Sequence, residues 1–225
     1  MIQGLLLVNK PKGKTSFSLV SALRRLTGVQ KIGHAGTLDP FAQGVMILLV
    51  GKNFTRCSDQ FLNQDKEYLA ELTLGVATDS YDSEGKIVSE SPYVPTLEQV
   101  ETALLSFQGT LLQTPPMFSA KKVDGTRLYE LARKGISIER EPVSVTMHTE
   151  LISYDYPRLT LRVSCSKGTY IRSIAQDLGA MLTCGAYLSD LTRTRSGAYL
   201  LSECIDGNLL FSPPYAIGPH LRGML

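Results

Sequence analysis

The sequence contains no tryptophan, only three histidines and four cysteines, and no long hydrophobic run. Its longest unbroken apolar segment, Val45 to Val50, is far shorter than the roughly 20 residues that cross a bilayer as a helix, so no membrane association is expected. The cysteines form no CxxC pair and the histidines have no metal-ligand spacing, so neither a disulfide framework nor a zinc site is predicted. We therefore expect a protein that uses no metal and no cofactor.

The N-terminal segment MIQGLLLVNKPKGK has no basic start ahead of its apolar residues, unlike a secretory signal, so we expect a cytoplasmic protein with reduced thiols. Hydrophobic residues make up 43% and charged residues 20% of the 225 residues, which excludes a disordered, collagen-like or coiled-coil chain. No stretch with a shift in composition divides the chain, so a single domain is predicted.

Charge is unevenly distributed, although 23 Lys and Arg against 21 Asp and Glu leave a formal net charge of only +2. The first 56 residues carry eight cations and one acid, Asp39, whereas residues 57–101 carry ten acids and two cations. A cationic surface suits a phosphate backbone, because each contact releases counterions. A solvated basic face is the other interpretation, but the single acid among eight cations favours a functional role.

Hydrophobic periodicity predicts both strands and helices. Apolar runs at 5–8 and 45–50 indicate buried strands, and alternation over 68–74 and 159–165 indicates half-buried antiparallel strands. Because strands and helices are interspersed without strict alternation, we expect an α+β fold with a mixed or antiparallel central sheet flanked by helices and loops. The predicted helices run from Ser16 to Gly28, from a capping box of Thr96 and Gln99 to Gly109, from a cap at Thr126 to Gly135, and over 171–182.

Asp39 and Pro40 lie in the segment GHAGTLDPFAQG, residues 33–44. Asp is a favoured helix cap and Pro a favoured first helical residue, so capping is the simplest interpretation of the pair. A carboxylate in a cationic, glycine-rich loop, however, stays ionised and lies where a polyanion would bind. Residues 113–140, which include PPMFSAKKVDG, form either a tolerated insertion or a binding arm.

Two further segments have alternative interpretations. GKTS, residues 13–16, is similar to the end of a phosphate-binding loop, but Val8 replaces the first glycine, so a nucleotide-dependent kinase or GTPase is not favoured. Ser16 is instead predicted to cap a helix, with Lys10, Lys12 and Lys14 facing phosphates or water. CSKGTYIR, residues 165–172, passes from a strand into a helix.

In this second segment Arg172 lies off the apolar stripe of the helix, which fits a solvent arginine as well as a functional one. Tyr68, at the head of its strand, fits a core or edge aromatic. The sequence has no GxSxG motif and no suggestive Cys/His arrangement. Any chemistry would therefore rest on carboxylate, arginine and tyrosine.

Five long blocks, found in order between about residue 5 and about residue 200, resemble the TruB family of tRNA pseudouridine synthases. The resemblance implies a pseudouridine synthase fold and isomerisation of uridine 55 in the TΨC loop of tRNA to pseudouridine. The blocks are NKPKGKTS, GHAGTLDPFAQGVMILLVGKNFTR, DKEYLAELTLGVATDSYDSEG, PPMFSAKKVDGTRLYELARKG and CSKGTYIRSIAQDLGAMLTCGAYLSDLTRT.

By this resemblance Asp39 is the essential carboxylate, and whether it attacks the sugar or the base or removes a ribose proton stays open. Arg172 would pair with Asp39 and keep it charged, and Tyr68 would stack on the flipped uracil and assist proton transfer at C5. His34 would fill the gap that the flipped base leaves, and Leu191 and Tyr170 would line the pocket. The residues expected to contact RNA are Lys10, Lys12, Arg56, Lys121, Lys122 and Arg127, the last three in the insertion 113–140 that would clasp the TΨC loop.

The chain departs from the family pattern at Tyr187, where a histidine is common, and at Thr192, where an arginine is usual. The resemblance further implies a catalytic domain over 1–205 and a tail over 206–225, without the C-terminal RNA-binding (PUA) domain of many bacterial relatives. The expected partner is the TΨC stem-loop of tRNA, bound by a monomer. The alternative is a non-catalytic RNA-binding or tRNA-folding factor on the same scaffold, against which the retention of Asp39, Tyr68 and Arg172 argues.

Overall fold

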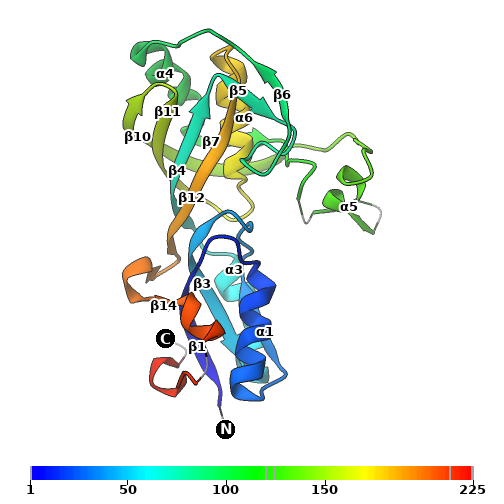
Figure 1. Cartoon of the computed structure of the whole chain (residues 1–225), viewed down its shortest axis with the longest axis vertical. Helices are drawn as coiled ribbons and strands as arrows, with labels where there is room; N and C mark the ends of the chain where they lie inside the picture. Colours follow the sequence, from blue (N-terminus) through cyan, green and yellow to red (C-terminus); the bar gives the residue numbers. More distant parts are fainter. Residues whose placement is uncertain (1, 120, 124, 213, 224–225) are drawn as a thin grey trace. The chain divides into compact units, whose positions relative to one another are not determined.

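The computed structural model of the chain describes residues 2–119, 121–123, 125–212 and 214–223. The chain forms two compact units, one of residues 1–69 with 191–225 and the other of residues 70–190 (Figure 1). The unit boundaries fall inside two strands, β4 (Lys66–Leu74) and β12 (Ala186–Ser196), so each strand contributes residues to both units. The expected domain limits of 1–205 and 206–225 stay a prediction.

In the first unit the strand order is β14–β1–β3–β12–β4, with β2 added to β3 and β13 to β12. Strands β1 and β3 are antiparallel neighbours, and Val8 lies opposite Met46, so the two apolar runs lie side by side. Both runs are buried, which confirms the predicted strands. The strand bounds are β1 (Gly4–Lys10), β2 (Ile32–Ala35), β3 (Gln43–Val50), β13 (Tyr199–Leu200) and β14 (Ile205–Asp206).

Helix α1 (Ser16–Thr27), drawn in blue in Figure 1, contacts β2 and ends at Gly28, whose φ of 71° is left-handed. The N-cap is Thr15 rather than the predicted Ser16, because the Thr15 hydroxyl accepts a hydrogen bond from the Ser18 amide. The other helical segments of this unit are α2 (Lys52–Thr55), α3 (Ser58–Leu62), η2 (Leu201–Glu203), η3 (Gly207–Phe211) and η4 (Gly218–His220).

In the second unit the strand order is β12–β4–β11–β10–β7, and a small sheet pairs β5 with β6. Every second residue from 66 to 74 and from 159 to 165 is buried, which confirms the predicted alternation. Apart from a short hairpin in the insertion, the strands that lie wholly in this unit are β5 (Val76–Thr78), β6 (Ile87–Glu90), β7 (Gly109–Gln113), β10 (Val143–Asp155) and β11 (Arg158–Cys165).

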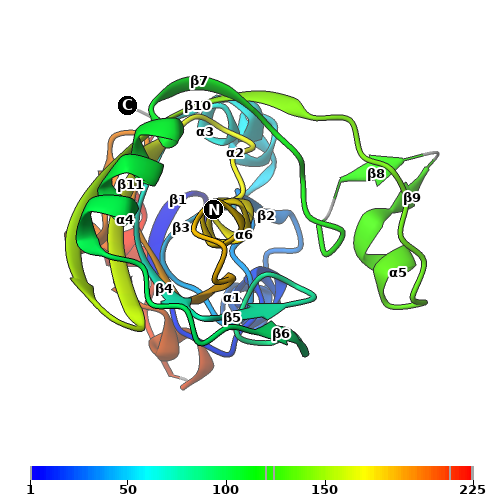
Figure 2. The same cartoon turned by 90° about the horizontal axis from the view of Figure 1, so that it is seen from above.

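Two predicted helices of the second unit are confirmed, and a third starts later than expected. Helix α4 (Leu97–Leu104) has the predicted capping box of Thr96 and Gln99 and continues as η1 (Leu105–Phe107), and α6 (Ile171–Met181) carries the predicted stripe. Figure 2 draws α4 against β10 and β11. Thr126 caps no helix, because it belongs to β9 (Thr126–Arg127), which pairs with β8 (Lys122–Val123) before α5 (Leu128–Ala132).

The mixed sheet with flanking helices confirms the α+β class. Within the second unit, both views draw the β8–β9 hairpin and α5 as a projection to one side of the sheet (Figures 1 and 2). In the part of the chain that the structure describes, no helix is both long and apolar enough to cross a membrane.

Candidate functional site

Asp39 lies in a tight turn between β2 and β3 in the first unit. Pro40 and Phe41 are turn residues, and the amide of Ala42 donates to the carbonyl of Asp39 at 3.1 Å. No helix follows Pro40, so the interpretation of the pair as a helix cap is wrong. Asp at the first and Pro at the second position of a turn is a favoured combination. The turn leaves Asp39 partly exposed and fixes its backbone.

The turn is held from the side of β1 by two groups. The amide of Gly13 donates to the carbonyl of Pro40 at 2.8 Å, and the Lys10 ammonium donates to the same carbonyl at 3.2 Å. Lys10 is 0% exposed and also donates to the carbonyls of Pro11 and Lys14. The Lys10 ammonium is thus held by backbone carbonyls next to the turn, and its expected contact with RNA phosphate stays a prediction.

Two more contacts fix the segments on either side of Asp39. The Ser16 hydroxyl donates to the carbonyl of Leu38 at 3.1 Å and accepts from the amide of Leu38 at 3.0 Å. At the other end, the side-chain oxygen of Asn9 accepts from the amide of Gly44 at 3.2 Å. Ser16, predicted as a helix cap, thus binds the residue next to Asp39 and couples the start of α1 to the turn.

Arg193 is a functional candidate that the sequence analysis missed. It lies on β12, is 1% exposed, and its Nε donates to the carbonyl of Val45 at 2.7 Å. Its Nη2 donates to the carbonyl of Gly36 at 3.2 Å. The only sequence signal was a charged residue two positions after the apolar Leu191 on the same strand, since alternate residues of a strand share a face and Leu191 is also buried.

His34 lies on β2 opposite Leu48. Burial lowers the pKa of its imidazole below the usual 6.5, and the positive charge of Arg193 lowers that pKa further. Its Nδ1 is buried and has no hydrogen-bond partner. The lowered pKa favours the uncharged form of the ring, which suits a side chain that is expected to fill the gap left by a flipped base.

The other expected site residues of the first unit differ in exposure. Tyr68 on β4 and Leu191 on β12 are 9% and 5% exposed, so both side chains are held by packing. Lys12 and Arg56 are exposed, as RNA-contacting cations should be. Lys14 is exposed too, with its ammonium 5.0 Å from the centre of the Phe211 ring.

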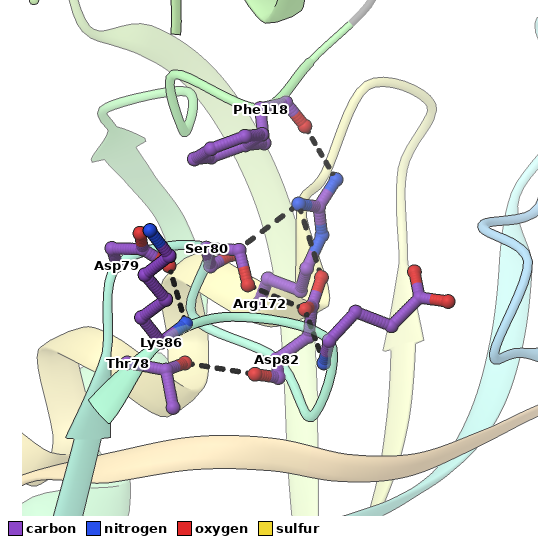
Figure 3. A network of polar contacts seen from close by, with 8 residues as sticks. Thr78, Asp79, Ser80, Asp82, Lys86, Phe118 and Arg172 are labelled. Carbon is purple, nitrogen blue, oxygen red and sulfur yellow. Dashed lines mark hydrogen bonds and ion pairs between the residues drawn. The ribbon is translucent and has the colours of Figure 1, made fainter. Parts of the chain in front are cut away.

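Arg172 lies in the first turn of α6 in the second unit and is buried rather than solvent-exposed. Its Nη1 is 3.3 Å from a carboxylate oxygen of Asp82, and both side chains are only 5–6% exposed. The same guanidinium donates to the carbonyls of Ser80 at 3.3 Å and Phe118 at 2.8 Å (Figure 3). The solvent interpretation of Arg172 is therefore wrong.

Asp82 is itself held by the loop between β5 and β6. The Ser80 hydroxyl donates to one of its carboxylate oxygens at 2.5 Å, and the amide of Glu84 donates to the same oxygen at 3.1 Å. The Thr78 hydroxyl donates to the backbone carbonyl of Asp82 at 2.8 Å (Figure 3). The loop thus presents one carboxylate oxygen to Arg172 and satisfies the other itself.

The base of the insertion 113–140 is tied to the start of α6. The Gln113 side chain donates to the carbonyl of Tyr170 at 3.1 Å and accepts from the Tyr170 amide at 2.8 Å. The Ser173 hydroxyl donates to the carbonyl of Thr114 at 2.9 Å. Tyr170 and Lys121 are half-buried, and the side chains of Lys122 and Arg127 lie outside the described part of the structure.

The described residues contain no group of three or more His, Cys, Asp or Glu side chains that could hold a metal ion. What they offer is a partly exposed carboxylate on a braced turn, an uncharged imidazole and, in the second unit, a fixed guanidinium. Such groups can act as nucleophile or base and as anion partner.

Solved structures define the class of this fold. One chain of the "Crystal Structure of a Cbf5-Nop10-Gar1 Complex" matches with a TM-score of 0.71 and 26% identity, over 92% of this chain and 54% of that one. A "Crystal structure of pseudouridylate synthase" matches with a TM-score of 0.50 and 19% identity, over 92% and 68%. The fold is that of the pseudouridylate synthases.

Sequence comparison narrows the class. Residues 24–171 match the N-terminal domain of the TruB family of pseudouridylate synthases. The chain is 66% identical over 206 residues to the tRNA pseudouridine synthase B of Protochlamydia amoebophila, covering 92% of this chain and 79% of that one. It is 47% identical over 210 residues to that of Clostridium novyi, covering 93% and 72%. The chain belongs to the TruB family.

Proposed function

We propose that this protein converts uridine 55 in the TΨC loop of tRNA to pseudouridine. The relatives with 47–66% identity carry the name tRNA pseudouridine synthase B. The observation that carries the proposal is the turn at Asp39, because Lys10, Gly13 and Ser16 hold the backbone on both sides of one carboxylate.

The reaction is an isomerisation and needs no oxidant, reductant or energy source. The bond between N1 of uracil and C1′ of the ribose breaks, the base turns, and C5 forms a new bond to C1′. The proton on C5 is then lost to solvent, and N1 gains a proton. The target base must leave its stack to reach a protein side chain, and an aromatic surface offsets part of that cost.

In this proposal Asp39 makes the first contact with the reacting nucleotide, by attack or by proton removal. Arg172 is required together with Asp39, and the buried ion pair with Asp82 keeps its guanidinium fixed. Tyr68 stacks on the flipped uracil, and its hydroxyl assists the departure of the C5 proton.

The same proposal assigns the remaining residues to RNA contacts. His34 fills the gap that the flipped base leaves, Leu191 and Tyr170 line the pocket, and the insertion 113–140 clasps the TΨC loop. We further propose that the protein acts as a monomer in the cytoplasm, where its tRNA substrate is found. The proposed phosphate contacts are Lys12, Arg56, Lys121, Lys122 and Arg127.

Tritium release from a tRNA transcript labelled at C5 of uridine tests the function directly. We expect stoichiometric release from one uridine per transcript, and none from a control transcript that carries cytidine at position 55. Binding of the transcript without tritium release would favour the non-catalytic RNA-binding factor instead. Release from uridines elsewhere in the transcript would contradict the assignment to position 55.

A further inference from the structure

Arg193 has the largest fully buried side chain in the described part of the chain. Its guanidinium donates to two backbone carbonyls and lies 4.0 Å from the sulfur of Met46. Among the described residues, no carboxylate forms an ion pair with it. Burying a cation without a counter-charge costs folding free energy, so such an arrangement calls for an explanation other than stability.

The two carbonyls that Arg193 binds lie on opposite limbs of the Asp39 turn. Gly36 directly follows β2 on the way into the turn, and Val45 lies in β3 just after the turn. One planar guanidinium with donors in a fixed fork can hold both limbs at a set spacing, which a single ammonium cannot do as well. Arg193 therefore closes the turn at its base.

The surrounding backbone leaves little freedom around this clamp. A Cβ atom at Gly36 would lie 3.4 Å from Nη1 of Arg193, and one at Gly44 would lie 2.3 Å from the carbonyl oxygen of Arg193. Both glycines also have positive φ angles, of 89° and 113°. Glycine at positions 36 and 44 therefore leaves the space that the guanidinium and the backbone of Arg193 occupy.

The positive charge of Arg193 also acts on His34, which lies on the strand that leads into the turn. Helices α1, α2 and α3 contact β2 as well, and their charged residues are Arg24, Arg25, Lys52 and Asp59. Arg193 is nevertheless the charged group responsible for the lowered pKa of the imidazole, next to burial. Strand β3, paired with β2, carries no charged residue.

We propose that Arg193 is a positioning residue for Asp39, because its guanidinium fixes the spacing of the two limbs that carry the carboxylate. Its positive charge also acts on His34, on the strand that leads into the turn. Only the expected effect of Arg193 on catalysis rests on the proposed function. The clamp and the electrostatic effect are properties of the free protein and can be measured without RNA.

The catalytic consequence is tested with Arg193→Lys, which keeps the charge but cannot bridge both carbonyls. We expect kcat to fall by about tenfold or more, while the Kd for tRNA stays within about twofold of wild type. Arg195→Lys is the matched control, because Arg195 lies two residues along the same strand and, among the described residues, its guanidinium donates to the carbonyl of Gly197 and to none in the Asp39 turn. Wild-type kcat in Arg193→Lys would overturn the positioning of Asp39.

The electrostatic part is tested by NMR titration of His34 in the free protein. Arg193→Met removes the charge, so the pKa of His34 should rise, whereas it should stay lowered in Arg193→Lys. An unchanged pKa in a folded Arg193→Met variant would overturn this part. If Arg193→Met does not fold, a pKa raised to the usual 6.5 in Arg193→Lys would overturn it equally. If the wild type released no tritium, the proposed function would be refuted, but the titration would still decide whether Arg193 lowers the pKa of His34.

Discussion

Arg172 and Asp82 form a buried ion pair, with Nη1 3.3 Å from Oδ2, between the first turn of α6 and the loop that joins β5 to β6. The same guanidinium also donates to the carbonyls of Ser80, from Nη1, and Phe118, from Nη2. A buried pair of this kind stabilises little by itself, but the loss of one partner leaves an uncompensated charge. The orientation of Arg172 therefore depends on the β5–β6 loop.

Arg172→Lys should lose most turnover and keep tRNA binding, because a lysine keeps the charge but cannot reach all three acceptors. We also expect a loss of unfolding free energy of about 1–3 kcal/mol from the unpaired groups. Tritium release, filter binding and urea denaturation measure the three effects. Arg162→Lys, at an exposed pair with Glu150, is the control and should change stability by about 1 kcal/mol or less.

Asp39→Asn should abolish tritium release and keep or improve RNA affinity, since one negative charge leaves a cationic segment. Single-turnover kinetics and the Kd for tRNA, measured on the same preparation, separate the two. Turnover within about tenfold of wild type would contradict the assignment of Asp39 as the essential carboxylate.

Tyr68→Phe separates stacking from proton transfer. The ring remains, so RNA binding and base flipping should be normal, and fluorescence of a reporter base at the target position should respond as in wild type. If the hydroxyl moves the C5 proton, tritium release should nevertheless fail. Full activity would reduce Tyr68 to a stacking role.

Ser16→Ala should lower both stability and turnover, because it leaves the amide and the carbonyl of Leu38 without their partner next to Asp39. The expected loss of unfolding free energy is about 1–3 kcal/mol. Thr15→Ala is the matched control: it removes the N-cap of α1 at a cost of about 1 kcal/mol and should leave turnover unchanged. Equal turnover in the two variants would show that the contact with Leu38 does not serve the turn.

His34 should make stability depend on pH. Its pKa is lowered in the folded state, so the unfolded state binds its proton more readily. The contribution of His34 is fully present above its usual pKa of about 6.5 and is lost as the pH falls from there toward the folded pKa. As the pH is lowered through this interval, the melting temperature of the wild type should fall, and that of His34→Gln should fall less. His148→Gln, at an exposed position of β10, should behave as wild type.

The regular elements could be predicted because their signals are local. The apolar runs of β1 and β3, the alternation in β4 and β11, and the capping box of α4 each lie within about a dozen residues. The helix cap was misplaced by one residue, since Thr15 and Ser16 carry the same functional group and only the backbone decides which of them caps.

The hydrogen bonds that hold the Asp39 turn and Arg172 in place could not be predicted, because the two partners of each bond are far apart in the sequence. The Nε of Arg193 donates to a carbonyl 148 residues away, and Arg172 donates to one 92 residues away. A backbone carbonyl leaves no mark on the sequence, so nothing distinguished Lys10, which is buried, from Lys12, which is exposed. Asp39 could be singled out from the sequence because it is the only acid among the first 56 residues, a feature that composition does record, and its role as the essential carboxylate stays a prediction.

The edge of β1 that faces away from β3 is covered at two places. The amide and carbonyl of Leu5 exchange hydrogen bonds with Arg222 at 2.8 and 2.9 Å, and Val8 and Asn9 pair with β14. An uncovered strand edge is a template for pairing with other chains. Residues 205, 206 and 222 thus cover the edge of the apolar first strand, and during synthesis this edge stays open until residue 222 has been made.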